Sequence, residues 1–158
     1  MATPDFRALA LMSKPSGVLS IIGSSYIVSD VLRDKRKRNS TYHRLMVGLS
    51  IVDIIGSLVG PFLSTWPMPR DSGAWGAVGT VSSCDAAGFF FQFTAAAGPL
   101  YNVSLARYYY LILRHNWSDR RLKEVEIWFH IVPWMVGLIT ATAGLILKIY
   151  SSGVFSCW

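Results

Sequence analysis

Four long apolar stretches alternate with short polar breaks along this chain. They cover about 15–32, 45–66, 86–113 and 127–149. An α-helix rises about 1.5 Å per residue, so roughly 20 apolar residues are enough to cross the hydrocarbon core of a bilayer. The pattern therefore predicts an all-α membrane protein, in which the stretches form an antiparallel bundle of four transmembrane helices.

The composition favours the same class of protein. Of the 158 residues, 52% are hydrophobic and 15% are charged, whereas a soluble domain carries about 25% charged residues. The mean hydropathy is +0.38. The formal net charge of +6 does not point to nucleic acid, because the basic residues lie in the breaks between apolar stretches, as in oriented membrane proteins. The expected partner is the lipid bilayer, and no nucleic acid is expected.

The basic residues are distributed unevenly among the breaks. Ten of the 15 Lys and Arg residues lie in 33–44 or 114–126, and the second break contains only Arg70. Cytoplasmic loops of membrane proteins are enriched in Lys and Arg, so both basic loops are predicted to be cytoplasmic. Residues 1–14 then form a short extracellular N-terminus, and 15–158 form the single transmembrane domain of an integral, multi-pass protein of the plasma membrane.

Local signals refine the predicted helices. Pro15 is expected at the first turn of the first helix, because proline is tolerated there. Pro61 is expected to kink the second helix, and Gly98-Pro99 is expected to kink or break the third. Ser118-Asp119 has the residue types of a cap at the start of the fourth.

Two polar residues inside the apolar stretches are candidate functional groups. Asp53 is the only charged residue of 45–66, and a carboxylate at that depth costs on the order of 3 kcal/mol on insertion scales. It should therefore face the helix bundle or a water-filled pocket. A neutral, protonated Asp53 that hydrogen-bonds to a serine or a backbone carbonyl is the plainer alternative. Asn102 lies in the third stretch, where its amide is suited to hydrogen bonds between helices.

The chain has two cysteines, Cys84 and Cys157. On the predicted topology Cys84 lies at the start of the third helix and Cys157 follows the fourth, so both fall on the outer face. Disulfides form in oxidising compartments such as the cell exterior. Pairing of the two cysteines is therefore the economical interpretation.

Five features occur in order along the chain. They are Leu49-Ser50-Ile51-Val52-Asp53 in the second stretch, Cys84 at the start of the third, Ala106-Arg107-Tyr108 near its end, Trp134 in the fourth, and Cys157-Trp158 after it. Together they resemble the first half of the seven-helix G-protein-coupled receptors, of the divergent rhodopsin-like, cAMP-receptor-like or secretin-like kind found in microalgae and other protists. In that family the third helix closes with an Asp/Glu-Arg-Tyr motif, in which Ala106 here replaces the acidic residue.

The resemblance implies a role for several residues. Arg107 and Tyr108 would face the cytoplasm, where the family binds a heterotrimeric G protein. Asp53 and Asn102 would be buried polar switch residues, and Trp134 would pack between helices. The paired cysteines would hold an outer loop over a pocket for an extracellular ligand of unknown identity. Because such receptors have three further helices, the resemblance also implies that this chain is a fragment or truncated form without helices five to seven. A heterotrimeric G protein is then expected as a partner if helices five to seven are supplied.

Two other functions stay open at this point. In a transporter or channel component, Asp53, Asn102, His130 and the Gly98-Pro99 break would line an ion path. A structural four-helix membrane subunit is the other alternative. The sequence contains no nucleophile–base pair and no metal-ligand set with a defined spacing, so neither an enzyme nor a cofactor or metal site is expected.

Overall fold

The computed structural model describes residues 4–152 and Cys157, and this part of the chain is almost entirely helical. It contains four long helices: α1 (Pro4–Arg33), α3 (Thr41–Ser57), α4 (Val81–His115) and α5 (Asp119–Ile146). Three short helical segments complete the fold: α2 (Lys35–Arg38), the π-helix η1 (Leu58–Leu63) and the 3₁₀-helix η2 (Arg70–Ser72).

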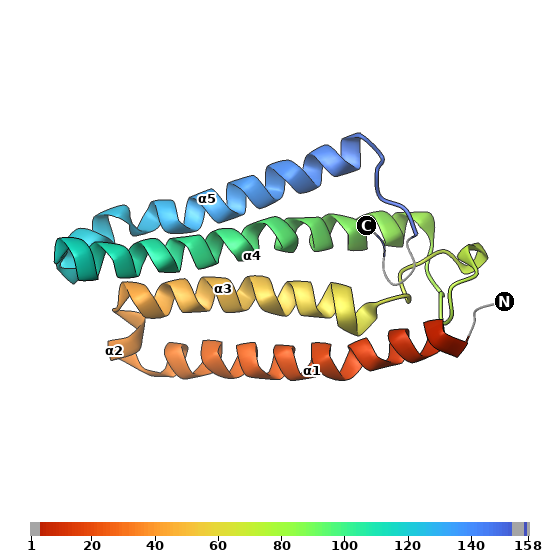
Figure 1. The fold of residues 1–158 in the computed structure, drawn as a ribbon, viewed down its shortest axis with the longest axis horizontal. Helices are drawn as coiled ribbons and strands as arrows, with labels where there is room; N and C mark the ends of the chain where they lie inside the picture. The colour runs from red at the N-terminus through yellow and green to blue at the C-terminus, as the bar shows by residue number, and fades with distance from the viewer. Residues whose placement is uncertain (1–3, 153–156, 158) are drawn as a thin grey trace.

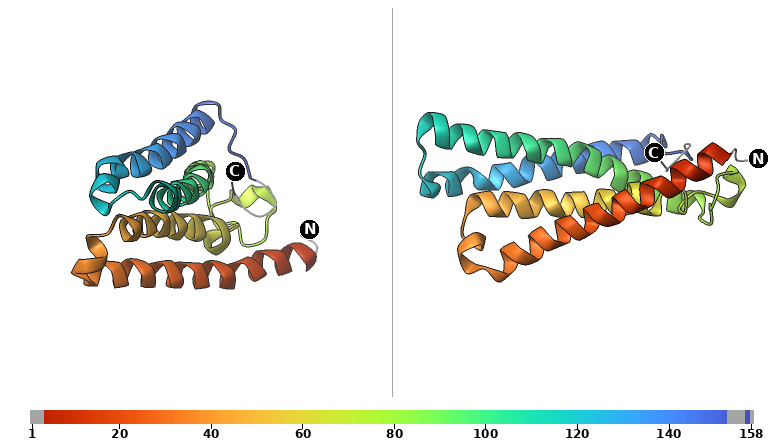
Figure 2. Two further views of the ribbon diagram at one scale, coloured as in Figure 1. Left: turned by 60° about the vertical axis from the view of Figure 1, so that its left-hand side comes forward. Right: turned by 60° about the horizontal axis from the view of Figure 1, so that its bottom comes forward.

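The four long helices lie lengthwise beside one another, and the chain reverses direction from each to the next (Figures 1 and 2). α3 packs between α1 and α4, and α5 packs mainly against α4. Residues 34–40 and 116–118 connect the helices at one end, which we call the basic end. Residues 58–80, residues 147–152 and Cys157 lie at the other end, which we call the disulfide end (Figure 1).

Three helices of the described chain are long and apolar enough to cross a membrane: Leu11–Arg33, Thr41–Leu63 and Asp119–Ile146. The prediction of an all-helical protein with membrane-length apolar helices is confirmed to this extent. α4 does not meet the same criterion, although it is 35 residues long. Its predicted span contains many small and polar residues, which lower its mean hydropathy. The fourth transmembrane helix of the prediction is therefore not confirmed.

α1 begins well before the predicted start at residue 15. Pro4 occupies its first position and Pro15 lies inside the helix. A proline at the first helical position gives up no hydrogen bond, because that N–H has no intrahelical acceptor. The predicted helix start at about residue 15 is thus wrong, and the prediction that 1–14 is extracellular stays a prediction. Residues 1–3 lie outside the described part of the chain.

The predicted second helix, 45–66, consists of two segments. α3 begins at Thr41 and runs to Ser57, and it continues into the π-helix η1, which contains Pro61. Proline cannot donate the backbone hydrogen bond of an α-helix, and a wider π turn is one way for a helix to accommodate the disruption. The helical segment ends at Ser64, whose φ is 49°.

α1 supplies hydrogen-bond donors to carbonyl groups of η1. The Ser13 hydroxyl donates to the Pro61 carbonyl oxygen at 3.2 Å, and the Lys14 ammonium donates to that of Phe62 at 2.9 Å. The Lys14 ammonium also lies 4.1 Å from the centroid of the Trp66 ring, a cation–π distance. These contacts hold α1 against η1 at the disulfide end.

Both ends of α4 extend beyond the predicted 86–113. At the start, the Thr80 side chain accepts from the Ser83 amide at 3.3 Å and the Ser83 side chain accepts from the Thr80 amide at 2.7 Å. This reciprocal pair is a capping box, which satisfies amides that have no intrahelical acceptor. At the other end, Asn116 adopts a left-handed conformation with φ 49°, as residues after helices often do.

The structure gives the course of the two later helices. α4 is continuous through Pro99, so the helix is not interrupted there, and the predicted kink at Gly98-Pro99 stays a prediction. α5 runs over Asp119–Ile146 in place of the predicted 127–149. Ser118 does occupy the N-cap position, but its side chain makes no capping hydrogen bond.

The main buried cluster lies where α3, α4 and α5 meet. Its members are Leu45, Val52, Phe93, Ala97, Tyr101, Tyr108, Leu122, Phe129 and Ala141. α4 and α5 approach each other closely at Gly137, where an added Cβ would lie 2.9 Å from the backbone oxygen of Phe93. Only a residue without a side chain fits there, which is the usual role of small residues between membrane helices.

We expect Gly137→Val to destabilise the protein, because the new side chain has to displace the backbone of α4. Overpacking of this kind costs roughly 1–3 kcal/mol, which should lower the midpoint of thermal unfolding in detergent. Gly98→Ala is the matched control, since a Cβ on Gly98 meets no atom within 4 Å and alanine favours helix. Equal unfolding midpoints for the two variants would contradict this packing.

Candidate functional site

An ion pair with a buried carboxylate joins the start of α3 to α5 near the basic end. Glu126 is 8% exposed, and the guanidinium of Arg44 donates to both of its carboxylate oxygens. The hydroxyl of Thr41, which is itself fully buried, donates to the Glu126 carboxylate at 2.9 Å. Bidentate pairing of arginine with a carboxylate is among the stronger polar contacts in proteins. Glu126 therefore has the donors that a buried carboxylate requires.

Polar contacts continue from Glu126 toward the middle of the molecule. The imidazole Nε2 of His130 lies 3.8 Å from a Glu126 oxygen, and its Nδ1 lies 3.1 Å from the hydroxyl oxygen of Tyr101. The Trp134 indole N–H donates to the same hydroxyl oxygen at 2.8 Å. Tyr101 is fully buried, so its O–H needs an acceptor, and Nδ1 of His130 can serve as one when the imidazole proton is on Nε2.

Trp134 combines this hydrogen bond with a ring contact. Its side chain is 37% exposed, and its ring centroid lies 5.2 Å from that of Phe93 on α4. Such aromatic pairs add to the free energy of packing beyond the area they bury. Trp134 thus touches α4 through both Phe93 and Tyr101.

Arg44, Glu126 and Tyr101 are site residues that the sequence patterns do not distinguish. Arg44 and Glu126 lie in the breaks 33–44 and 114–126, and Tyr101 lies within the third apolar stretch. A signal was nevertheless available in α5. The buried residues of this helix include Leu122, Glu126, Phe129, Pro133 and Gly137, and a spacing of three or four residues places them on one face. Glu126 therefore falls on the buried face of an otherwise apolar stripe.

Asp53 occupies a second polar cluster, between α1 and α3. The hydroxyls of Ser20 and Ser24 donate to the same carboxylate oxygen at 2.8 Å and 2.5 Å. The hydroxyl of Ser57 donates to Ser20 at 2.9 Å. Asp53 thus faces another helix, as its charge predicted, and its partners are serines, as in the alternative of a neutral, hydrogen-bonded carboxyl group.

Asp53 also borders an open groove of about 400 Å³ between α3 and α4. Asn102, Gly98 and Pro99 line the same groove, but His130 does not. The prediction that Asn102 is buried is wrong, because its side chain is exposed on the α4 side of the groove. Three features of the predicted ion path are therefore together, and the histidine lies apart from them.

Arg107 and Tyr108 point to different environments. Arg107 is exposed and lines a groove between α4 and α5. Tyr108 is only 8% exposed, and its ring lies 6.0 Å from that of Tyr42 on α3. Tyr108 therefore packs between helices, and the prediction that the two residues face the cytoplasm stays a prediction. Adjacent residues on a helix are separated by about 100°, so they rarely share an environment.

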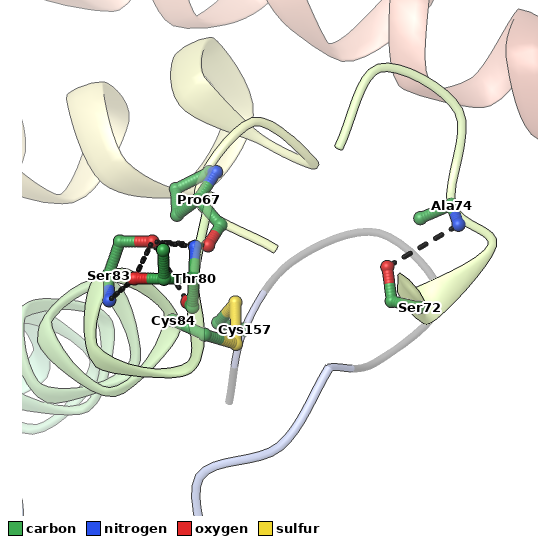
Figure 3. Close-up of a disulfide and its surroundings, with 7 residues drawn as sticks. All are labelled: Pro67, Ser72, Ala74, Thr80, Ser83, Cys84 and Cys157. Atoms are coloured by element: carbon green, nitrogen blue, oxygen red, sulfur yellow. Dashed lines mark hydrogen bonds between the residues drawn. A yellow bond between two sulfur atoms is a disulfide. The ribbon is translucent and has the colours of Figure 1, made fainter. Parts of the chain in front are cut away.

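The disulfide end is held together by Cys84 and Cys157, whose sulfur atoms are 2.02 Å apart (Figure 3). This bond joins the first turn of α4 to the segment that follows α5. Beside it, the Ser83 hydroxyl donates to the Pro67 carbonyl at 2.8 Å (Figure 3). This hydrogen bond attaches the loop after η1 to the start of α4, next to the disulfide. Trp158, the other residue of the Cys-Trp motif, lies outside the described residues.

At the basic end, Lys37 of α2 pairs with Asp30 of α1 at 2.6 Å. The hydrogen bond to Asp30 raises the pKa of the Lys37 ammonium above its usual value. The side chains of this pair are 34% and 43% exposed. Arg44 is as exposed as Lys37, but the Glu126 side chain is only 11% exposed, so the two pairs differ in the burial of their carboxylates. Exposed pairs contribute little to stability, because water and salt screen them.

Comparison of the chain with protein-family models, with curated proteins and with solved structures finds no match. The function is therefore inferred from the residues and contacts of this chain.

We expect Arg44→Met to cost about 3–5 kcal/mol of stability, because it leaves the Glu126 carboxylate buried without its cation. The double variant Arg44→Met/Glu126→Leu should recover most of that loss, since no unpaired charge remains. Thermal unfolding of the single and double variants in detergent gives the coupling energy. Lys37→Met is the control, and removal of that exposed pair should cost no more than about 1 kcal/mol. A similar loss of stability in Arg44→Met and Lys37→Met would contradict the larger contribution of the Arg44–Glu126 pair.

Proposed function

We propose that this chain is the membrane-embedded helical unit of a G-protein-coupled-receptor-like protein that acts in signal transduction. In this proposal α1, α3, α4 and α5 all cross the bilayer and form an antiparallel bundle. The observation that carries the proposal is the chemical difference between the two ends of the molecule. The disulfide of Cys84 and Cys157 lies at one end, and most of the Lys and Arg residues lie at the other.

The two ends suit the two sides of a plasma membrane. Disulfides persist in the oxidising exterior, and basic loops remain in the cytoplasm. The connections 34–40 and 116–118 lie at the same end of the molecule (Figure 1). The disulfide end would then be extracellular, together with the start of α1, and the two basic connections would be cytoplasmic.

A fourth span through α4 is consistent with its length and its neighbours. At about 1.5 Å per residue, 35 residues extend for about 50 Å, which exceeds the hydrocarbon core of a bilayer. No charged residue occurs between Asp85 and Arg107. The helix packs against both α3 and α5, so part of its surface meets protein in place of lipid. Small and polar residues are favoured at such contacts.

The receptor-like proposal assigns each end a partner. An extracellular ligand would bind near the disulfide end, where the bond between Cys84 and Cys157 fixes the segment after α5 over the start of α4. A heterotrimeric G protein would bind at the basic end. Asp53 would act as the polar switch between α1 and α3, because its serine partners can exchange hydrogen bonds at small cost. Tyr108 would stabilise the packing of α4 on α3.

A transporter or channel is the less favoured candidate. Asp53 and Asn102 border one groove, but His130 is bonded to Tyr101 and does not line it. The polar groups that an ion would need are thus not aligned along one route. A purely structural subunit would not require the exposed Arg107 or the polar cluster around Asp53.

The proposed orientation can be tested with two variants, each of which adds one cysteine to the native pair. Ser72→Cys lies at the disulfide end and Ser118→Cys at the basic end, and both positions are exposed. The native cysteines are paired with each other and should not react. A membrane-impermeant maleimide should label Ser72→Cys in intact cells, and Ser118→Cys only after permeabilisation. Labelling of Ser118→Cys in intact cells would reverse the orientation.

Coupling to a G protein can be tested with the full chain in nanodiscs of zwitterionic lipid. If the chain is receptor-like, it should accelerate guanine-nucleotide exchange by a purified heterotrimeric G protein. Arg107→Ala should reduce the acceleration, because it removes the cation that the resemblance places against the G protein. Arg70→Ala, at the opposite end, should leave it unchanged. No acceleration by the wild-type chain with any class of Gα subunit would refute G-protein coupling by this chain without helices five to seven.

A further inference from the structure

The groove between α4 and α5 combines apolar walls with one cation. It has a volume of about 330 Å³ and lies on the half of the molecule nearer the basic end. Most of its lining is aliphatic or aromatic, including Val103, Trp117, Trp128 and Val132. Arg107 is the one charged residue among the residues that line it. The groove therefore offers a long apolar surface beside a single positive charge.

Arg107 has no protein partner within the described part of the chain. No hydrogen bond, ion pair or ring contact of its guanidinium is found among residues 4–152 and Cys157. The indole N–H groups of Trp117 and Trp128 likewise donate to no acceptor among these residues. By contrast, the Ser104 hydroxyl in the same groove donates to the Leu100 and Phe129 carbonyls. Arg107 thus offers an ionised donor to an anion at the groove.

From this combination we propose that the groove is a binding site for an anionic phospholipid. The guanidinium of Arg107 receives the phosphate of the head group, because arginine binds phosphate through two parallel N–H donors. The acyl chain lies along Val103, Trp128 and Val132. Charge complementarity selects a phospholipid with a net negative charge over a zwitterionic one, whose own cation opposes Arg107.

Basic residues near the groove favour an anionic phospholipid as its ligand. Arg114 lies two helical turns beyond Arg107 on the same face of α4, since seven residues make almost two full turns. Arg120 and Arg121 follow at the start of α5. Clusters of Lys and Arg at the cytoplasmic side of membrane helices attract anionic lipids, and tryptophans favour the interface between hydrocarbon and head groups. The site rests on the proposal that the chain is embedded in a membrane, and does not depend on G-protein coupling.

Native mass spectrometry of the full chain in a non-ionic detergent tests this site directly. Phosphatidylglycerol should bind about tenfold more tightly than phosphatidylcholine of equal acyl length, the difference that a charge-assisted hydrogen bond supplies. Arg107→Gln should remove this preference. Arg120→Gln should retain it, because Arg120 is exposed at the same end but does not line the groove. Trp128→Leu, with Arg107 intact, should weaken the binding of phosphatidylglycerol by removing a wall of the groove.

Several outcomes would overturn the proposal. One is an equal affinity of the wild-type chain for the two lipids. Another is an equal loss of preference in Arg107→Gln and Arg120→Gln, which would assign the effect to the general charge of the basic end. Displacement of the lipid by glycerol 3-phosphate at a similar concentration would point to a soluble phosphate as the ligand. Because the measurement uses purified protein in detergent, a failure of the G-protein assay leaves its result unaffected.

Discussion

A carboxylate that is buried between helices needs donors from its neighbours, because the loss of its hydration costs several kcal/mol. Glu126 obtains them from Arg44 and Thr41, which both lie in the first turn of α3. These residues are more than 80 positions away from Glu126 in the sequence. The register of α3 against α5 is therefore fixed by one charged group, in a region where the remaining contacts are largely apolar and tolerate sliding.

The same requirement is met in a different way at Asp53. Its partners are two hydroxyls of α1, and no cation pairs with it among the described residues. Hydroxyl donors are weaker than a guanidinium and rotate freely, so this cluster joins α1 to α3 less rigidly than Arg44 joins α3 to α5. The helices α3 and α5 are thus joined by a charge-assisted pair, whereas α1 is joined to α3 by hydroxyl donors alone at Asp53. A switch residue is better placed between α1 and α3.

Much of the fold was accessible from the sequence, because the transfer of apolar residues out of water depends on local composition. Three of the predicted spans correspond to helices of membrane length. The helix ends were less accessible, because they depend on single hydrogen bonds. The capping box of Thr80 and Ser83 extends α4 by five residues before the predicted start, and the position of Pro4 at the first turn of α1 was overlooked in favour of Pro15.

Residues of the candidate site could be predicted from the sequence only where their charge or polarity differed from that of their neighbours in the chain. Asp53 is conspicuous as the single charge of its stretch, whereas Glu126 lies at the edge of a stretch, next to other charges. Tyr101 has no such contrast in an aromatic-rich helix. The exposure of Asn102 and the burial of Tyr108 were not predictable from the sequence for a related reason. When a helix is apolar on every side, its sequence does not reveal which face meets another helix.

The low mean hydropathy of α4 follows from the residues that it uses to pack against other helices. Ala97 is buried in the cluster where α3, α4 and α5 meet, and Ser104 bonds to the Phe129 carbonyl of α5. Packing between two helices does not by itself lower hydropathy, because α3 lies between α1 and α4 and has the highest hydropathy of the three candidate spans. The difference lies in the residues at the contacts, since small and polar side chains lower the mean hydropathy of a helix and aliphatic ones raise it. In the proposed topology α4 would be the fourth span, and a criterion based on hydropathy alone would miss it for this reason.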